Sequence, residues 1–151
     1  MPGKEYPKNR NGRLCLQTGK KPFYIYNVKK NSIRLKTRIE KITLDADTMM
    51  LTGLVLNELI SNSLKHAFCN KESGLLMITM QQNENGEELV LEVKDNGVGF
   101  PSGLYLDRSG RLGYKLIKAF AHKLKAEVVV LNNNGTCVRL YIKKYQVCSY
   151  S

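Results

Sequence analysis

Residues 57–68, which read NELISNSLKHAF, decide how the rest of this chain is interpreted. They lie late in a mostly apolar run that has the composition of a helix. Each residue of an α-helix turns by about 100°, which predicts one polar arc on this helix. The polar arc holds Glu58, Asn62, Lys65 and His66. The opposite arc is predicted to be apolar, and it holds Met49, Leu56, Ile60, Leu64 and Ala67. A carboxylate, an amide, an ammonium group and an imidazole are costly to bury without partners, so the polar arc predicts a functional site.

A solvated helix face is the alternative reading of the same pattern. It fits less well, because Leu51 and Val55 lie on the polar arc. The polar residues are also not the spaced mixture of Glu and Lys that is typical of a solvated helix face.

The composition is that of one soluble globular domain, with 151 residues, 42% hydrophobic and 25% charged. No apolar run approaches the roughly 20 residues that span a bilayer, and residues 1–14 lack the apolar region of a secretory signal. We therefore expect a cytoplasmic protein with no membrane segment. The cysteines form no CxxC pair and, with two histidines, make no zinc pattern, so reduced thiols are expected. They are Cys15, Cys69, Cys137 and Cys148.

The net charge of +11 is concentrated near the N-terminus. Residues 1–40 hold eleven Lys and Arg against two acids, whereas the other 111 residues hold thirteen against eleven. A basic arm can bind nucleic acid or an anionic membrane, but this one has no nucleic-acid motif and few aromatic residues. We expect a solvated arm, do not expect nucleic acid as a partner, and leave the role of the arm open.

Hydrophobic periodicity predicts alternating strands and helices along the rest of the chain. Asp45 or Asp47 is expected to cap the first helix, and residues 83–86 are expected to form a hairpin turn. The second helix carries Leu112, Leu116, Phe120 and Leu124 at i+4 spacing. Strands are predicted at 23–28, 33–39, 75–82, 89–94, 127–131 and 137–142, and helices at 48–68 and 112–124.

This order of elements predicts an α+β two-layer sandwich with a mixed, mostly antiparallel sheet and helices on one face. We expect three parts along the chain. Residues 1–30 form a basic irregular arm, residues 31–145 form the folded domain, and residues 146–151 form a C-terminal tail.

Residues 95–99, which read DNGVG, end the predicted central strand. Asp95 places a carboxylate at the strand terminus, and Gly97 and Gly99 permit backbone conformations and close approaches that other residues do not. A DxGxG sequence taken alone is equally consistent with a simple tight turn.

Further glycines follow at residues 110–113, which read GRLG and open the second helix. Free backbone N–H groups at a helix N-terminus favour an anion such as phosphate. One such motif is weak evidence, because loops and helix caps are rich in glycine. Gly135 and Thr136 lie in a predicted hairpin and mean little by themselves.

Taken together in this order, the four pieces resemble the Bergerat ATP-binding fold of the histidine kinase, DNA gyrase and heat-shock chaperone superfamily. Residues 53–68, GLVLNELISNSLKHAF, followed by DNGVGFP at 95–101, look like the ATP-binding domain of sensor histidine kinases. The branch that they resemble has an N-box reading NELxxNxxKHAF. The resemblance covers about residues 33–143.

The resemblance implies ATP and Mg²⁺ as ligands. Asn62 matches a Mg²⁺ ligand, and Glu58 matches the glutamate that orients metal-bound water or accepts a proton. Asp95 matches the carboxylate that accepts from the adenine amino group, with Thr136 assisting through water. Gly97 and Gly99 would let the loop pass the base. Residues matched to the phosphates are Lys65, His66, Gly110, Arg111, Leu112 and Gly113, and residues 101–111 would form a nucleotide lid.

Two departures from the family pattern stand out. The second glycine box usually reads GLGL or LGL, but here Tyr114 follows Gly113, which puts the packing of the lid in doubt. The phosphoacceptor module is also not evident, because residues 1–32 hold no histidine. His66 belongs to the N-box, and His122 is expected to be an ordinary residue of the second helix.

The resemblance therefore implies the catalytic domain of a two-component sensor histidine kinase, which transfers the γ-phosphoryl group to a histidine outside this chain. Its partners would be a dimerisation and phosphoacceptor helix and, through it, a response regulator. One rival is a stand-alone serine protein kinase of the anti-sigma type. Another is a catalytically silent module that binds ATP or only a partner protein.

Overall fold

The computed structural model describes residues 14–17, 22–29, 33–99, 112–143 and 145. They form one seven-stranded sheet with the strand order β1-β2-β3-β4-β5-β7-β6. Only β3 and β4 pair in parallel, and every other neighbouring pair is antiparallel. The strands are β1 (Leu14–Gln17), β2 (Pro22–Lys29), β3 (Ile33–Ile39), β4 (Gly74–Gln82), β5 (Leu89–Asp95), β6 (Ala126–Asn132) and β7 (Thr136–Ile142).

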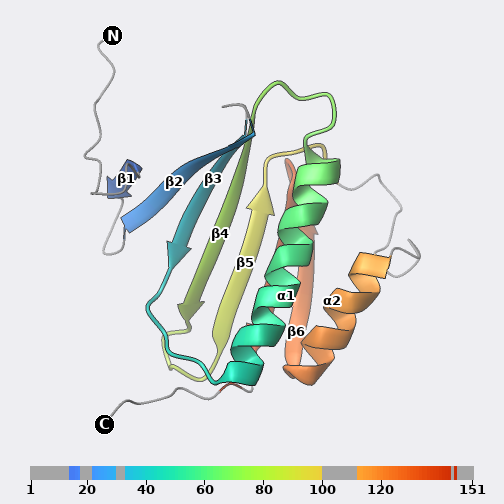
Figure 1. Cartoon of the computed structure of the whole chain (residues 1–151). Coiled ribbons are helices and arrows are strands. Elements are labelled where there is room, and N and C mark those ends of the chain that lie inside the picture. The colour runs from blue at the N-terminus through green and yellow to red at the C-terminus, as the bar shows by residue number, and fades with distance from the viewer. Residues whose placement is uncertain (1–13, 18–21, 30–32, 100–111, 144, 146–151) are drawn as a thin grey trace.

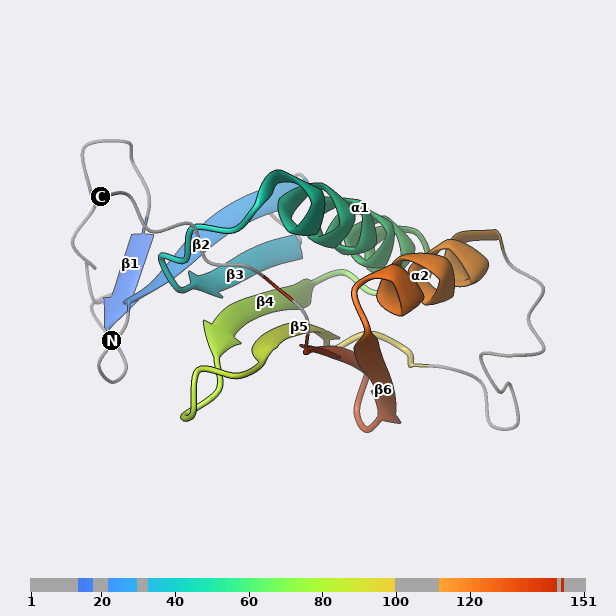
Figure 2. The ribbon, with the colours of Figure 1, turned by 90° about the horizontal axis from the view of Figure 1, so that it is seen from below.

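Both long helices, α1 (Ala46–Asn62) and α2 (Leu112–Lys123), lie on the same face of the sheet (Figures 1 and 2). A π-helix, η1 (Ser63–Ala67), continues α1. The predicted α+β sandwich, with a mixed and mostly antiparallel sheet covered on one face, is therefore confirmed.

The core lies between the sheet and the two helices. Strand β5 buries Leu89, Leu91 and Val93, because alternate side chains of a strand point to the same face. The same core cluster includes Ile117 of α2 and Val55 of α1, both of which are almost fully buried. The central position of β5 between β4 and β7 makes its C-terminal end a well-supported place for a functional residue.

The predicted start of α1 is confirmed, because Asp45 accepts a hydrogen bond from the Thr48 backbone nitrogen at 3.0 Å. The predicted apolar arc is correct for Ala67, which is buried, and for Leu56, Ile60 and Leu64, which pack against the core, but the predicted phase is wrong at two positions. Met49, placed on the apolar arc, is 57% exposed, whereas Val55, placed on the polar arc, is fully buried. The run is apolar almost all round, so hydrophobic periodicity alone does not fix which arc faces the sheet. The row that faces the core is Thr48, Thr52, Val55, Leu59 and Ser63.

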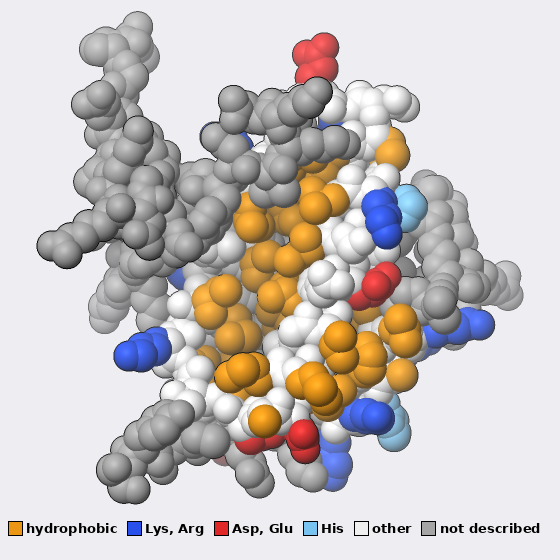
Figure 3. Space-filling view, viewed as in Figure 1, with side chains coloured by type: hydrophobic (Ala, Val, Ile, Leu, Met, Phe, Trp, Pro, Cys, Tyr) orange, Lys and Arg blue, Asp and Glu red, His pale blue; other side chains and the backbone are white. Residues whose placement is uncertain are grey.

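The spacing predicted for α2 also differs from the structure. Leu116 is 39% exposed, and the buried residues are Ile117, Ala121 and Leu124. Hydrophobic side chains consequently reach the surface on the helix-covered face (Figure 3), among them the exposed Met49, Met50 and Leu54 of α1.

The N-terminal part holds more structure than predicted. The expected strand at 23–28 corresponds to β2, but the segment before it was expected to be irregular and contains β1. Strand β1 pairs with β2 through backbone groups. The four residues of β1 read LCLQ, but they lie within residues 1–21, whose Gly-, Asn- and Lys-rich composition led us to expect irregular structure.

Candidate functional site

Asp95 is the last residue of β5, and its side chain is only 3% exposed. The strand alternation that buries Leu91 and Val93 also turns Asp95 toward the helices. A carboxylate at such a position needs hydrogen bonds to offset its desolvation. The structure provides three donors, which lie on three different segments of the chain.

One carboxylate oxygen of Asp95, Oδ1, accepts from the backbone nitrogens of Gly97 at 2.9 Å and Thr136 at 3.1 Å. The other, Oδ2, accepts from the Ser63 hydroxyl at 3.0 Å. All three donors are neutral, and Asp95 makes no ion pair with any residue that the structure describes. Within the described part of the chain, the carboxylate is thus oriented without an ion pair. With four lone-pair sites and three recorded donors, it keeps room to accept from a ligand.

The loop after β5 is fastened to the end of the first helix. The Val98 nitrogen donates to the Ala67 carbonyl at 2.8 Å. A side chain at position 97 would place its Cβ 2.2 Å from that same carbonyl oxygen, so only glycine fits there. Gly99 adopts a φ of +72°, in the left-handed region that favours glycine. The structure therefore requires glycine at both glycine positions of the DxGxG sequence.

The β6–β7 hairpin also contacts Asp95. A Cβ added to Gly135 would lie 2.0 Å from the Asp95 carbonyl oxygen, which shows how closely the two backbones pass. This approach brings the Thr136 nitrogen to the carboxylate. Thr136, 41 positions from Asp95 in the sequence, therefore meets Asp95 and Gly97 in the structure.

The polar residues of the first helix precede and follow Ser63, which belongs to this network. Glu58 and Asn62 are half-buried, and their side chains make no hydrogen bond to any of the described residues. Asn62 is the last residue of α1 and directly precedes Ser63, which holds Asp95. Lys65 and His66 belong to the π-helix and are exposed. An amide oxygen and a carboxylate with no partner within the described part of the chain are suitable ligands for a hard cation such as Mg²⁺.

The remaining predicted residues are only partly covered. Gly110, Arg111 and the expected lid at 101–111 lie outside the described residues. Leu112 and Gly113 open helix α2 as expected. Tyr114, the departure from the family pattern, is half-buried and packs against the core, with the Lys118 ammonium 5.3 Å from the centre of its ring. His122 is exposed, as expected for an ordinary helix residue.

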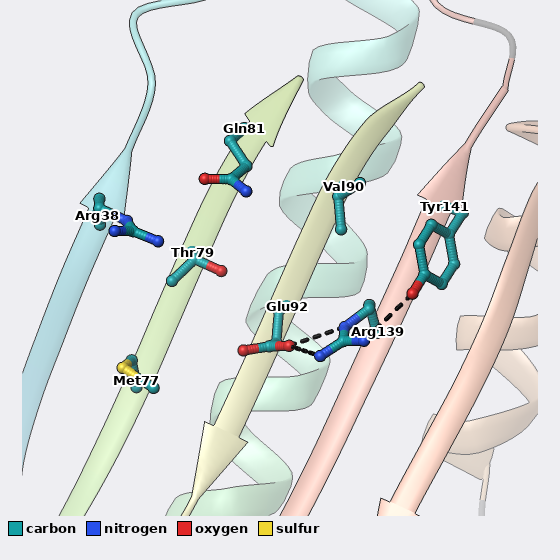
Figure 4. A pocket seen from close by; sticks show the side chains of 8 residues that line it. All are labelled: Arg38, Met77, Thr79, Gln81, Val90, Glu92, Arg139 and Tyr141. Atoms are coloured by element: carbon teal, nitrogen blue, oxygen red, sulfur yellow. Dashed lines mark hydrogen bonds and ion pairs between the residues drawn. The ribbon is translucent and has the colours of Figure 1, made fainter. Parts of the chain in front are cut away.

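A groove of about 380 Å³ lies on the opposite, uncovered face of the sheet (Figure 4). Glu92 projects into it from β5, and Arg139 of β7 donates to that carboxylate from Nε at 2.8 Å and from Nη2. Arg139 also donates to the Tyr141 hydroxyl at 3.2 Å. Hydrogen bonds to Tyr141 and to Glu92 raise the pKa of the Arg139 guanidinium. Here the carboxylate is already paired with a cation, so the groove offers no uncommitted acid for catalysis.

The buried thiol of Cys137 lies on β7, the strand that carries Arg139. Burial, and secondarily the Glu92 carboxylate, raise the pKa of the Cys137 thiol. A protonated thiol is a poor nucleophile. No group of three or more His, Cys, Asp or Glu that could hold a metal occurs among the described residues. None of the described helices is long and apolar enough to cross a membrane.

Residues 46–146 match the family described as histidine kinase-, DNA gyrase B- and HSP90-like ATPases. The chain belongs to this family of ATPases. Membership implies that the chain binds ATP.

Individual relatives come from both branches considered from the sequence. The chain is 27% identical over 114 residues to the blue-light-activated histidine kinase 2 of Erythrobacter litoralis, covering 75% of this chain and 33% of that protein. It is 33% identical over 113 residues to the anti-sigma F factor of Clostridium kluyveri, covering 68% of this chain and 72% of that protein. The chain thus spans about a third of the length of the first relative and most of the second.

A solved structure supports the same fold. The histidine kinase domain of a blue-light-activated kinase from Erythrobacter litoralis superposes with a TM-score of 0.71 at 27% identity. The match covers 76% of this chain and 52% of that domain.

Ser63 is the one site residue that sequence reasoning missed. It lies within the N-box between Asn62 and the basic pair, but its carboxylate partner is 32 positions away in the sequence. A hydroxyl at the end of the buried row of α1 was the only available signal.

Proposed function

We propose that this chain is the ATP- and Mg²⁺-binding catalytic domain of a two-component sensor histidine kinase. It would transfer the γ-phosphoryl group of ATP to a histidine outside this chain. The observation that carries the proposal is Asp95, a buried carboxylate held only by neutral donors and fastened to the end of the helix that bears Glu58 and Asn62.

The residues around Asp95 fit the adenine end of the nucleotide. An acceptor with room for a further donor suits the exocyclic amino group of adenine. The Thr136 backbone nitrogen lies 3.1 Å from the Asp95 carboxylate, and we assign the Thr136 hydroxyl to assist through water. Gly97 and Gly99 keep the loop free of side chains where the base would lie.

The residues of the first helix fit the phosphate end. We assign the Mg²⁺ to the Asn62 side-chain oxygen, with Glu58 positioned to hold metal-bound water or accept a proton. The metal would supply charge neutralisation to the triphosphate. Lys65, His66 and the segment Gly110, Arg111, Leu112 and Gly113 are proposed to approach the phosphates, where positive charge and free backbone N–H groups favour an anion.

The division of the chain remains part of the proposal. Residues 31–145 would be the ATP-binding domain of the NELxxNxxKHAF branch, preceded by the basic arm and followed by a short tail. Its site of action would be the cytoplasm. Its partners would be a phosphoacceptor helix and, through it, a response regulator.

A stand-alone serine protein kinase is the second candidate. The 33% identity to an anti-sigma F factor, of which the chain covers 72%, favours it. The KHAF ending of the N-box favours the histidine kinase.

One labelling experiment separates the candidates. The purified chain is incubated with γ-labelled ATP and Mg²⁺, together with either a dimerisation-helix fragment of a histidine kinase or the serine-bearing partner of an anti-sigma kinase. We expect weak, acid-labile and base-stable label on the helix fragment, because separate parts lack the effective concentration of a covalent link. The chain, whose only histidines are His66 and His122, should not label itself.

Acid-stable label on the serine partner alone would favour the second candidate. Acid-labile label on the chain itself would show that the acceptor has been misplaced. Nucleotide binding with no transfer to either substrate would favour the silent module.

A further inference from the structure

The Ser63 hydroxyl is bonded to Asp95, and the proposed function assigns it no role. Ser63 is the first residue of the π-helix, is 8% exposed, and donates to Asp95 Oδ2 at 3.0 Å. It is the only donor to that oxygen among the described residues, whereas Oδ1 has two backbone donors. The orientation of Oδ2 therefore depends on a single side chain.

Thr52 shows that a buried hydroxyl on this helix does not have to find such a partner. It lies on the same core-facing row of α1 and is 5% exposed. Its hydroxyl has no hydrogen-bond partner within the described part of the chain. Ser63 and Thr52 are thus two buried hydroxyls of similar exposure, and only one of them is joined to the site.

The hydrogen bond also sets which lone pairs of Asp95 are left for a ligand. Two amides occupy Oδ1, and Ser63 occupies one position on Oδ2. The remaining lone pair belongs to Oδ2. An ionised carboxylate carries no proton, so Oδ2 can accept a hydrogen bond but cannot donate one. An acceptor held in this way binds a ligand that donates an N–H group more tightly than one that presents a carbonyl oxygen. In the second case two acceptors face each other and both stay unpaired.

We propose that Ser63 is a positioning residue for base recognition, which holds Asp95 so that the site selects a 6-amino purine over a 6-keto purine. This inference rests on the proposed nucleotide site at Asp95. Ser63 acts through Asp95, so its removal leaves the carboxylate in place but releases Oδ2 to turn toward water. We therefore expect weaker binding only for ligands that donate a hydrogen bond to Oδ2.

The test compares Ser63→Ala with Thr52→Val as the matched control. ADP and inosine 5′-diphosphate, which differ in carrying an amino or a keto group at this position of the base, are titrated separately into each protein. Chemical-shift changes of the backbone amides give the dissociation constants, including weak ones.

We expect Ser63→Ala to weaken ADP binding by about 3- to 10-fold. This is less than the roughly tenfold or larger change that a direct hydrogen bond to a charged group contributes, because Ser63 acts on the ligand only through Asp95. Inosine diphosphate binding should stay within about twofold, so the ratio of the two constants falls. Thr52→Val should change neither constant.

Unchanged ADP binding in Ser63→Ala would overturn the inference while leaving the nucleotide site intact. Equal weakening for both nucleotides, or the same weakening in Thr52→Val, would also overturn it, because either result indicates a general packing effect. Failure of the unaltered protein to bind ADP would instead remove the proposed function, and with it this role of Ser63.

Discussion

Two carboxylates on strand β5, three residues apart, have opposite surroundings. Glu92 lies on the uncovered face of the sheet, where Arg139 neutralises it and Tyr141 completes the cluster (Figure 4). Asp95 lies on the helix-covered face at the end of the strand, where Ser63, Gly97 and Thr136 hold it and no described residue forms an ion pair with it. An ion-paired carboxylate is committed to the fold, whereas one held by neutral donors remains available to a ligand. The residues that contact each carboxylate, and not its burial alone, are therefore our basis for assigning Glu92 to the fold and for proposing Asp95 as a ligand-binding group.

The largest expected effect comes from Glu58→Gln, which probes the helix beside Asp95. We expect phosphoryl transfer to a phosphoacceptor helix to fall by about 10²- to 10⁴-fold, since this is the usual contribution of a positioned proton acceptor. Binding of ADP should remain within about twofold, because Glu58 is assigned to the phosphate end. Transfer rates and calorimetric titration measure the two effects, and retained transfer would remove Glu58 from catalysis.

A smaller effect is expected for Asn62→Ala. The increase in ATP affinity caused by Mg²⁺ should fall by about tenfold, the loss of one good ligand interaction. Affinity measured in chelator should change little. Equal losses with and without Mg²⁺ would mean that Asn62 is a structural amide and that the metal is held elsewhere.

The smallest effect is expected on the other side of the comparison, for Glu92→Gln. The pair with Arg139 is partly exposed, with side-chain exposures of 17% and 34%, so we expect a loss of about 1 kcal/mol in the free energy of unfolding. Urea denaturation measures it. ADP affinity should not change, and a large change would show that the two faces of the sheet are coupled.

The DxGxG loop could be predicted from sequence because its glycines stand in a short motif. The φ of +72° at Gly99 is a local requirement. The requirement at Gly97 comes from the Ala67 carbonyl, 30 positions away, and only the structure shows that contact. The fold followed for a related reason, since the order of strands and helices leaves few arrangements of a mixed sheet.

The features that the sequence did not reveal depend on distant contacts. Ser63 became a site residue only when the structure brought it to Asp95, and the partner of Glu92 is 47 positions away. The phase of α1 could not be read from a helix that is apolar almost all round, so Met49 was placed inside and Val55 outside. Strand β1 was missed because it is only four residues long and lies within a Gly-, Asn- and Lys-rich segment.

The most direct test of the account compares the two carboxylates themselves. ADP is titrated into the unaltered chain, Asp95→Ala and Glu92→Gln, and circular dichroism checks that all three are folded. A hydrogen bond to a charged group contributes roughly 1.5–3 kcal/mol, so Asp95→Ala should weaken binding by about 10- to 150-fold, while Glu92→Gln binds like the unaltered chain. An unchanged dissociation constant in folded Asp95→Ala would contradict the assignment of Asp95 as the nucleotide-binding carboxylate.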